Sequence, residues 1–199
     1  GGAHDSILYE CTILINTADH GGGVEDCTVH DSTLRGNDAE WGGALHVACD
    51  SRAEGCVIDS NHALIGGAVY SVLASRVSVF TKCDFLNNAA DEMGGAYYRF
   101  TGVDSLINCN IAYNVADTIQ VRYGGALVSD NAQYDSPEGG FYLVNCSLAH
   151  NIARRGAVFY TDEFRPDDKP MFHVRGGTIE SNHFLAEGSG MVPNAITGH

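Results

Sequence analysis

One pattern of apolar and polar positions recurs seven times along the chain and ends each time at an asparagine. A small residue stands five positions before each asparagine and an apolar residue three positions before it, with a mostly polar residue between the two. The asparagines are Asn16, Asn37, Asn61, Asn88, Asn114, Asn151 and Asn182. The apolar residues are Ile13, Leu34, Ile58, Phe85, Ile111, Leu148 and Ile179. The small residues are Cys11, Ser32, Cys56, Cys83, Cys109, Cys146 and Gly177.

A glycine pair follows the first five asparagines and erodes after the last two. The pairs are Gly22-Gly23, Gly42-Gly43, Gly66-Gly67, Gly94-Gly95 and Gly124-Gly125, followed by Arg155-Gly156 and Gly188-Ser189-Gly190. Successive asparagines are 21 to 37 residues apart, while the offsets inside the motif stay fixed. Insertions therefore fall between motifs, as they do in repeat proteins.

The spacing of inward and outward positions predicts strands rather than helices. The small and apolar residues lie two positions apart, which is the period of a β-strand. Coils of this length, rich in glycine, favour an all-β right-handed parallel β-helix of about seven coils with three short strands in each. Equivalent residues of successive coils would then stack about 4.8 Å apart, giving an asparagine ladder along one edge. We expect each asparagine to make the bend itself, because this residue tolerates a left-handed backbone.

The two halves of the motif resemble a known repeat. Phe85-Leu86-Asn87-Asn88 with Gly94-Gly95-Ala96-Tyr97 is similar to the paired Phe-x-x-Asn and Gly-Gly-Ala-[Ile/Leu/Val] signature of the polymorphic outer-membrane protein family. Gly42-Gly43-Ala44-Leu45 and Gly66-Gly67-Ala68-Val69 match the second half outright. Members of that family are bacterial autotransporter adhesins, so the resemblance implies a β-helix that acts at the cell surface.

The composition of the chain disfavours some classes of binding partner. The formal net charge of −14 disfavours nucleic acid and anionic lipid, and no apolar run is long enough for a membrane-spanning helix. The chain opens on Gly1-Gly2-Ala3, a triplet that recurs inside the repeats. We therefore expect residues 1–199 to form a single β-helix domain that is a fragment of a longer repeat protein.

The seven cysteines allow two interpretations. Those in the column of small residues could form disulfides between coils, but the favoured interpretation is that they fill a corner as small inward residues. Cys27 and Cys49 lie outside that column in adjacent coils, and they are the predicted disulfide pair.

The sequence gives only a weak indication of metal or cofactor binding. Carboxylates that follow the ladder could bind calcium through hard oxygen ligands, and the candidates are Asp19, Glu40, Asp91 and Asp117. A solvated turn is the simpler interpretation, so no cofactor is expected other than possible calcium. No His-x-x-x-His or Cys-x-x-Cys spacing occurs, so we expect no zinc site.

We interpret the chain as a non-catalytic cell-surface or extracellular module that acts in adhesion or as a structural scaffold. Its partner would be a protein or glycan surface ligand, or neighbouring subunits, bound through the loops 116–123, 129–138 and 161–170. One alternative is a polysaccharide-cleaving enzyme similar to pectate lyases, although Asp167-Asp168 is the only Asp-Asp pair. A second alternative is a subunit of an extracellular filament or larger assembly.

Overall fold

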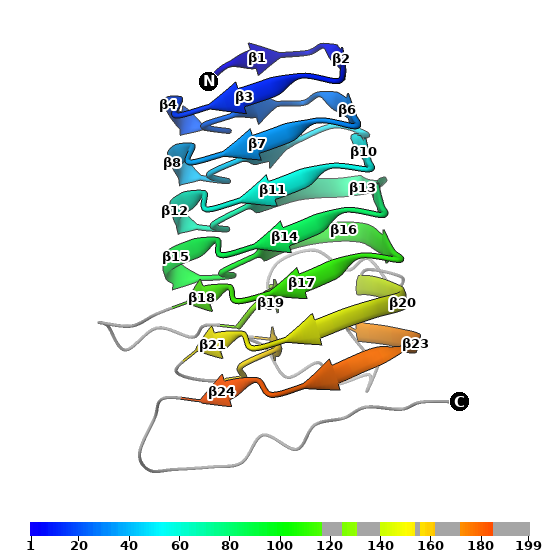
Figure 1. Cartoon of the computed structure of the whole chain (residues 1–199). Coiled ribbons are helices and arrows are strands. Elements are labelled where there is room, and N and C mark those ends of the chain that lie inside the picture. Colours follow the sequence, from blue (N-terminus) through cyan, green and yellow to red (C-terminus); the bar gives the residue numbers. More distant parts are fainter. Residues whose placement is uncertain (117–124, 131–139, 154–155, 162–171, 185–199) are drawn as a thin grey trace.

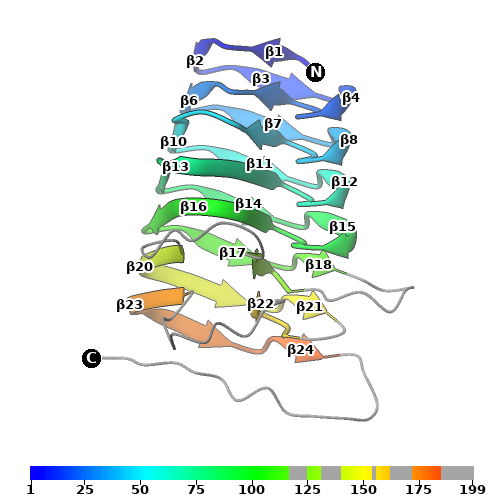
Figure 2. The same cartoon turned by 180° about the vertical axis from the view of Figure 1, so that it is seen from behind.

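A computed structural model describes residues 1–116, 125–130, 140–153, 156–161 and 172–184. These residues wind into a right-handed parallel β-helix whose coils stack from the N-terminal end toward the C-terminal end (Figure 1, Figure 2). The strands belong to one 17-stranded and one 7-stranded sheet, and every pairing between them is parallel. The predicted fold class is confirmed. The loops 116–123, 129–138 and 161–170 lie largely outside the described residues.

Each coil has four faces, A to D in chain order. Face A contains β1 (Ala3–His4), β5 (Val24–Glu25), β9 (Leu45–Val47), β13 (Val69–Thr81), β16 (Tyr97–Ile107), β19 (Leu127–Ser129) and β22 (Phe159–Thr161). Face B contains β2 (Ile7–Tyr9), β6 (Thr28–His30), β10 (Arg52–Glu54), the later parts of β13 and β16, and the first parts of β20 (Gly140–Ala149) and β23 (Phe172–Glu180).

Faces C and D flank the asparagines. Face C contains β3 (Thr12–Leu14), β7 (Thr33–Arg35), β11 (Val57–Asp59), β14 (Asp84–Leu86), β17 (Asn110–Ala112) and the ends of β20 and β23. Face D is the 7-stranded sheet of β4 (Thr17–His20), β8 (Asp38–Trp41), β12 (His62–Ile65), β15 (Ala89–Met93), β18 (Val115–Ala116), β21 (Ile152–Ala153) and β24 (His183–Phe184).

The structure corrects the number of strands in a coil. Three were predicted, with a turn after each asparagine, but the residues after the asparagine form the strands of face D. The reason is that the inward alternation continues past the bend: in the second coil Leu34, Asn37 and Ala39 are all buried. Asn and Ala therefore line the interior at alternate positions, and the residues between them face outward as in any strand.

The structure also places the left-handed residue one position before the asparagine, whereas the sequence had predicted it at the asparagine itself. Positive φ occurs immediately before the ladder asparagines, as at Ile15 (54°), Ser60 (55°) and Tyr113 (60°), and not at the asparagines themselves. The residues before the small-residue column behave alike, as at Lys82 (52°). Each bend is thus a single left-handed residue followed by an inward side chain. Asparagine is needed for its side chain rather than for its backbone tolerance.

The core consists of columns of like side chains that run along the helix axis. On face C, Leu34, Ile58, Phe85, Ile111 and Leu148 are in register and fully buried. On face D the inward position is alanine in six of the seven strands, from Ala18 to Ala153. Elsewhere in the interior aromatic rings pack against one another, as at Phe80, Phe85 and Tyr97. Each coil buries its apolar face against its neighbours.

Candidate functional site

All seven asparagines lie in one stack at the bend between faces C and D. The side-chain Nδ2 of each one donates to the Oδ1 of the next at 2.9–3.0 Å. Each Nδ2 after the first also donates to a main-chain oxygen one coil back, as from Asn88 to Ile58 at 2.9 Å. The five central asparagines are at most 1% exposed. Their hydrogen bonds are satisfied inside the protein, so the ladder holds the coils together and offers nothing to a ligand.

The column of small residues contains thiols and no disulfide. The Sγ of Cys83 donates to the oxygens of Thr81 and Ala53, and Cys56, Cys109 and Cys146 make the equivalent pairs of contacts. At the second level of the column, the Oγ of Ser32 donates to the oxygen of His30 at 2.6 Å. These residues therefore fill the bend as small inward side chains, which is the interpretation that the sequence favoured.

The predicted disulfide between Cys27 and Cys49 is not formed. Cys27 points inward and precedes Thr28, whose register partner in the next coil is Arg52. The neighbour of Cys27 in its column is therefore Ser51. Cys49 lies two residues earlier, and its main-chain N–H donates to the Asp26 carboxylate at 3.1 Å. Burial raises the pKa of the Cys27 thiol, which further lowers its reactivity.

The calcium candidates that the structure describes lie on the outside of face D. Asp19, Glu40 and Asp91 are exposed on strands of face D rather than at a turn, and Asp117 lies outside the described residues. Within the described ranges, just one group of three or more side chains has the geometry to share a metal ion, and none of these carboxylates belongs to it.

Asp91 instead takes part in a contact that spans three coils. The His62 ring lies between two carboxylates, with Nδ1 2.7 Å from Asp38 Oδ1 and Nε2 3.1 Å from Asp91 Oδ1. Partial burial works to lower the pKa of His62, but the hydrogen bonds to Asp38 and Asp91 outweigh it, and the pKa is raised. The contact is a surface ion pair between face D strands.

A polar cluster inside the solenoid is sealed from solvent. Arg99 and Asp104, both on β16, are 0% exposed. The Arg99 guanidinium donates to Ser129 Oγ and to the oxygen of Gly102, and lies 5.9 Å from the centre of the Phe141 ring. Burial raises the pKa of Asp104 to about 7, with Arg99 opposing the shift. A ligand cannot reach these groups without opening the coil, so we assign them to the core.

The candidate functional site lies on the outside of the glycine corner, where face D turns into face A. His4, Glu25, His46, Tyr70 and Tyr98 are successive register partners on face A, and we call this row the corner column. The His46 and Tyr70 rings stack with centroids 5.6 Å apart, and the Tyr70 and Tyr98 rings stack at 5.2 Å. The row is therefore continuous over five coils.

Two face D side chains join this column from across the glycines. His20 and Trp41 are register partners, and their rings meet edge to face with centroids 4.7 Å apart. His20 also lies 4.7 Å from the His46 ring, and Trp41 lies 6.3 Å from Tyr70. The glycines make this approach possible: a Cβ at Gly42, where φ is 69°, would lie 2.1 Å from the Leu45 oxygen. Side chains of face D that precede the glycines therefore contact side chains of face A that follow them.

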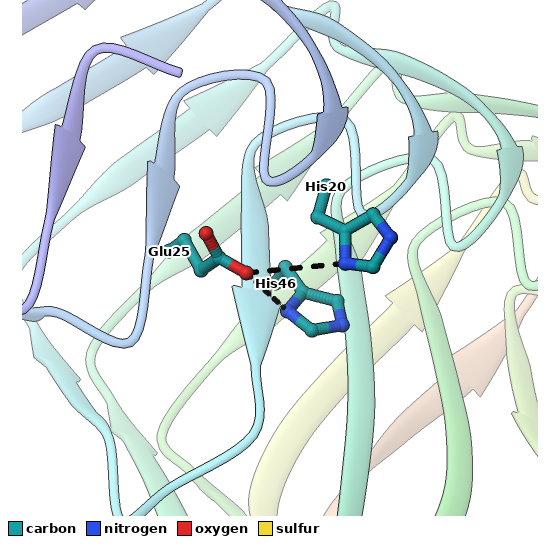
Figure 3. A group of neighbouring side chains, drawn as sticks. All are labelled: His20, Glu25 and His46. Carbon is teal, nitrogen blue, oxygen red and sulfur yellow. Dashed lines mark ion pairs between the residues drawn. The ribbon is translucent and has the colours of Figure 1, made fainter.

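The upper end of the corner column is a cluster of His20, Glu25 and His46 (Figure 3). Glu25 Oε1 lies 3.3 Å from His46 Nδ1 and 3.9 Å from His20 Nδ1. The other carboxylate oxygen, Oε2, lies 3.9 Å from His4 Nε2. Burial and the neighbouring His20 lower the pKa of His46, so its imidazole is neutral at neutral pH. One carboxylate is thus shared by imidazoles from different coils.

This cluster was not predicted from the sequence, although a signal for it is present there. His20 and Trp41 each stand immediately before a glycine corner, and Glu25, His46, Tyr70 and Tyr98 each follow the apolar residue of the next strand. Comparing these two outward positions from coil to coil would have collected all of them. A search for histidines spaced along a single segment could not, because the members come from three coils.

No family model, curated protein or solved structure matches this chain. The class that the structure defines is the parallel β-helix, and the resemblance to polymorphic outer-membrane proteins stays a prediction. Across the stretches that the structure describes, there is no helix with the length and apolar character needed to cross a bilayer.

Proposed function

We propose that this chain is a non-catalytic module of a cell-surface or extracellular protein, acting in adhesion or as a scaffold. The observation that carries the proposal is the register of the coils. Strands pair with the next coil on all four faces, and the asparagine ladder joins every level. Side chains on the outside therefore stand in fixed rows, which suits binding by shape over a long surface.

The flank at the glycine corner is the part of the described surface best suited to a partner. Trp41 is the single tryptophan of the chain, and both Trp41 and Tyr70 are partly exposed there. Tryptophan and tyrosine are enriched where proteins bind one another, because they offer a large rigid surface with a polar edge. We assign this flank, rather than the interior charges, to ligand contact.

The stacking in the corner column favours a protein partner over a glycan. Sugars bind aromatic residues through the flat face of the ring. Both faces of the Tyr70 ring are covered, by His46 on one side and Tyr98 on the other. Tyr70, which is partly exposed, presents its ring edge and hydroxyl instead, and these are suited to hydrogen bonds and close packing with a polypeptide.

Binding to a panel of extracellular proteins, glycans and intact cells tests the proposal. We expect saturable binding to a protein component, weakened about tenfold or more by the double variant Trp41→Ala/Tyr70→Ala. Tyr9→Ala is the matched control, because Tyr9 is 63% exposed on β2 of face B, away from the corner. The same preparation should release no sugar from acidic or neutral polysaccharides. Release that follows the purified chain would support the enzyme alternative and overturn the proposal.

A further inference from the structure

The cluster at the top of the corner column has the composition of a metal site. His20 comes from β4 in the first coil, Glu25 from β5 in the second and His46 from β9 in the third. Each offers one ligand atom, and these atoms all lie within 4.8 Å of one another. Two imidazole nitrogens and a carboxylate oxygen are a ligand set that zinc proteins use, with the fourth position left to water or another residue.

A second observation concerns His46 alone. Its side chain is 8% exposed, and Nδ1 makes no hydrogen bond to any described residue, although Glu25 Oε1 is only 3.3 Å away. A buried ring nitrogen without a well-formed hydrogen bond is costly, because it has lost water and gained only a loose contact with Glu25. A metal ion between His46 and Glu25 would remove that cost.

One of the distances between ligand atoms matches that of a loaded site. Bonds of about 2.0–2.1 Å in a tetrahedron place neighbouring ligand atoms about 3.3–3.4 Å apart. His46 Nδ1 and Glu25 Oε1 already have this separation, at 3.3 Å, and His20 Nδ1 is slightly farther out at 3.9 Å. All three ligand atoms lie within 4.8 Å of one another.

Neighbouring groups hold the imidazoles in place and favour a cation. His46 is stacked on Tyr70, and His20 is held edge-on by Trp41. The Asp26 carboxylate, next to Glu25 in sequence, adds negative charge, as does the net charge of −14 of the whole chain. His4 Nε2 lies 3.9 Å from Oε2, the other oxygen of the Glu25 carboxylate, and its side chain is 66% exposed.

We propose that His20, Glu25 and His46 bind one divalent transition-metal ion, of which Zn²⁺ suits the ligand types best, with water as the fourth ligand. The ion would join the first three coils through side chains, at the end of the ladder where Asn16 is only partly buried. This inference goes beyond the proposed function and does not depend on any partner. The hard cations Ca²⁺ and Mg²⁺ prefer all-oxygen sites and would not compete.

Isothermal titration of the full chain with Zn²⁺ tests the proposal, using protein without a histidine tag that has been freed of metal with a chelator. We expect one ion per chain at pH 7.5 and a rise in Tm with Zn²⁺ that Ca²⁺ does not produce. Co²⁺ should give visible absorption of a four-coordinate site. His20→Ala and Glu25→Gln should each lower the affinity at least about tenfold and remove most of the Tm shift.

The matched control is His30→Ala. His30 Nδ1 lies 4.0 Å from Glu54 Oε2, so it forms a histidine–glutamate pair like those in the cluster but lies on face B. This variant should bind Zn²⁺ as the original chain does. Glu25→Gln keeps the shape of the side chain, so its Tm without metal shows whether the coil is still folded. The proposal is overturned if the folded chain binds Zn²⁺ more weakly than about 100 µM. It is also overturned if His20→Ala and Glu25→Gln bind as tightly as His30→Ala.

Discussion

The Nδ2 of Asn88 donates to the Oδ1 of Asn114 at 3.0 Å, and the same Oδ1 accepts the main-chain N–H of Asn88 at 3.0 Å. One side-chain oxygen thus binds two donors of the preceding coil. A single asparagine therefore ties together two coils that are 26 residues apart in sequence.

Replacing Asn88 tests what this arrangement contributes to stability. Asn88→Ala leaves the Asn61 donors and the Ile58 oxygen without their partner, and should lower the free energy of unfolding by roughly 2–4 kcal/mol. Asn88→Asp should cost more at pH 7, because a carboxylate cannot donate to Ile58 or Asn114. Urea denaturation measures both. The control is Asn87→Gly, since Asn87 is exposed and has φ of 53°, which glycine adopts freely. Equal losses at positions 87 and 88 would contradict the ladder.

The buried Asp104 should make stability depend on pH. The pKa of its carboxyl is about 7 in the folded chain, well above its ordinary value of 3.8. Between these values the folded state holds a proton that the unfolded state has lost, so stability falls as pH rises from about 4 to about 7 and then levels off. The whole effect is about 4 kcal/mol. Asp104→Asn should remove this component from the pH profile of urea unfolding. A variant profile parallel to that of the original chain would disprove the shift.

The glycine corner should tolerate almost no side chain. A Cβ at Gly43 would lie 2.3 Å from the oxygens of both Gly67 and His62, and neither main-chain group can move without breaking the stack. Gly43→Ala should therefore abolish folding or lower Tm by many degrees in a thermal melt. At Gly36 φ is 63°, and a Cβ would meet only Ile15 Cγ1 at 3.8 Å. Gly36→Ala should cost only about 1–2 kcal/mol. A milder effect at Gly43 than at Gly36 would refute the tight corner.

The cysteine column should accept serine and stay reduced. Ser32 already occupies one of its levels and donates to the His30 oxygen as the thiols do to theirs. Cys83→Ser should therefore change the free energy of unfolding by no more than about 1 kcal/mol, whereas Cys83→Leu should destabilise strongly by overpacking. Mass spectrometry of alkylated, unreduced protein should find no Cys27–Cys49 bridge. Alkylation of the buried Cys56, Cys83, Cys109 and Cys146 should be slow until urea is added. A bridged pair in the native chain would contradict the observed register.

Much of the fold follows from the sequence because every coil repeats the same physical requirement. The apolar column from Leu34 to Leu148 and the stack from Asn16 to Asn182 need only a constant offset, and that offset is visible in the sequence. The side-chain period of two also predicts strands at these positions. For this reason the architecture could be predicted without any relative.

The errors have a shared cause. The face D strands were read as turns because they are short and because their outward positions, such as Asp19 and Glu40, look like loop residues. The left-handed residue was placed on the asparagine because a sequence does not show which of two adjacent residues turns the chain. The packing of neighbouring coils determines both the face D strands and the position of the left-handed residue.

The candidate site was hidden for a different reason. His20, Glu25 and His46 meet only because the glycine corner brings face D beside face A, and because 21 residues separate Glu25 from its register partner His46. The number of residues between motifs determines which side chains contact one another at the corner, and this number varies along the chain. Sequence offsets alone therefore predict the ladder far better than the cluster.

Side-chain amide exchange tests the central claim, that an internal ladder orders the outer rows, most directly. In NMR spectra of the folded chain, the side-chain NH₂ groups of Asn37, Asn61, Asn88, Asn114 and Asn151 should exchange with solvent far more slowly than those of the exposed Asn87 and Asn145. Fast exchange at the ladder positions in a folded chain would contradict the stack, and the assignment of the glycine corner as a binding flank would lose its basis.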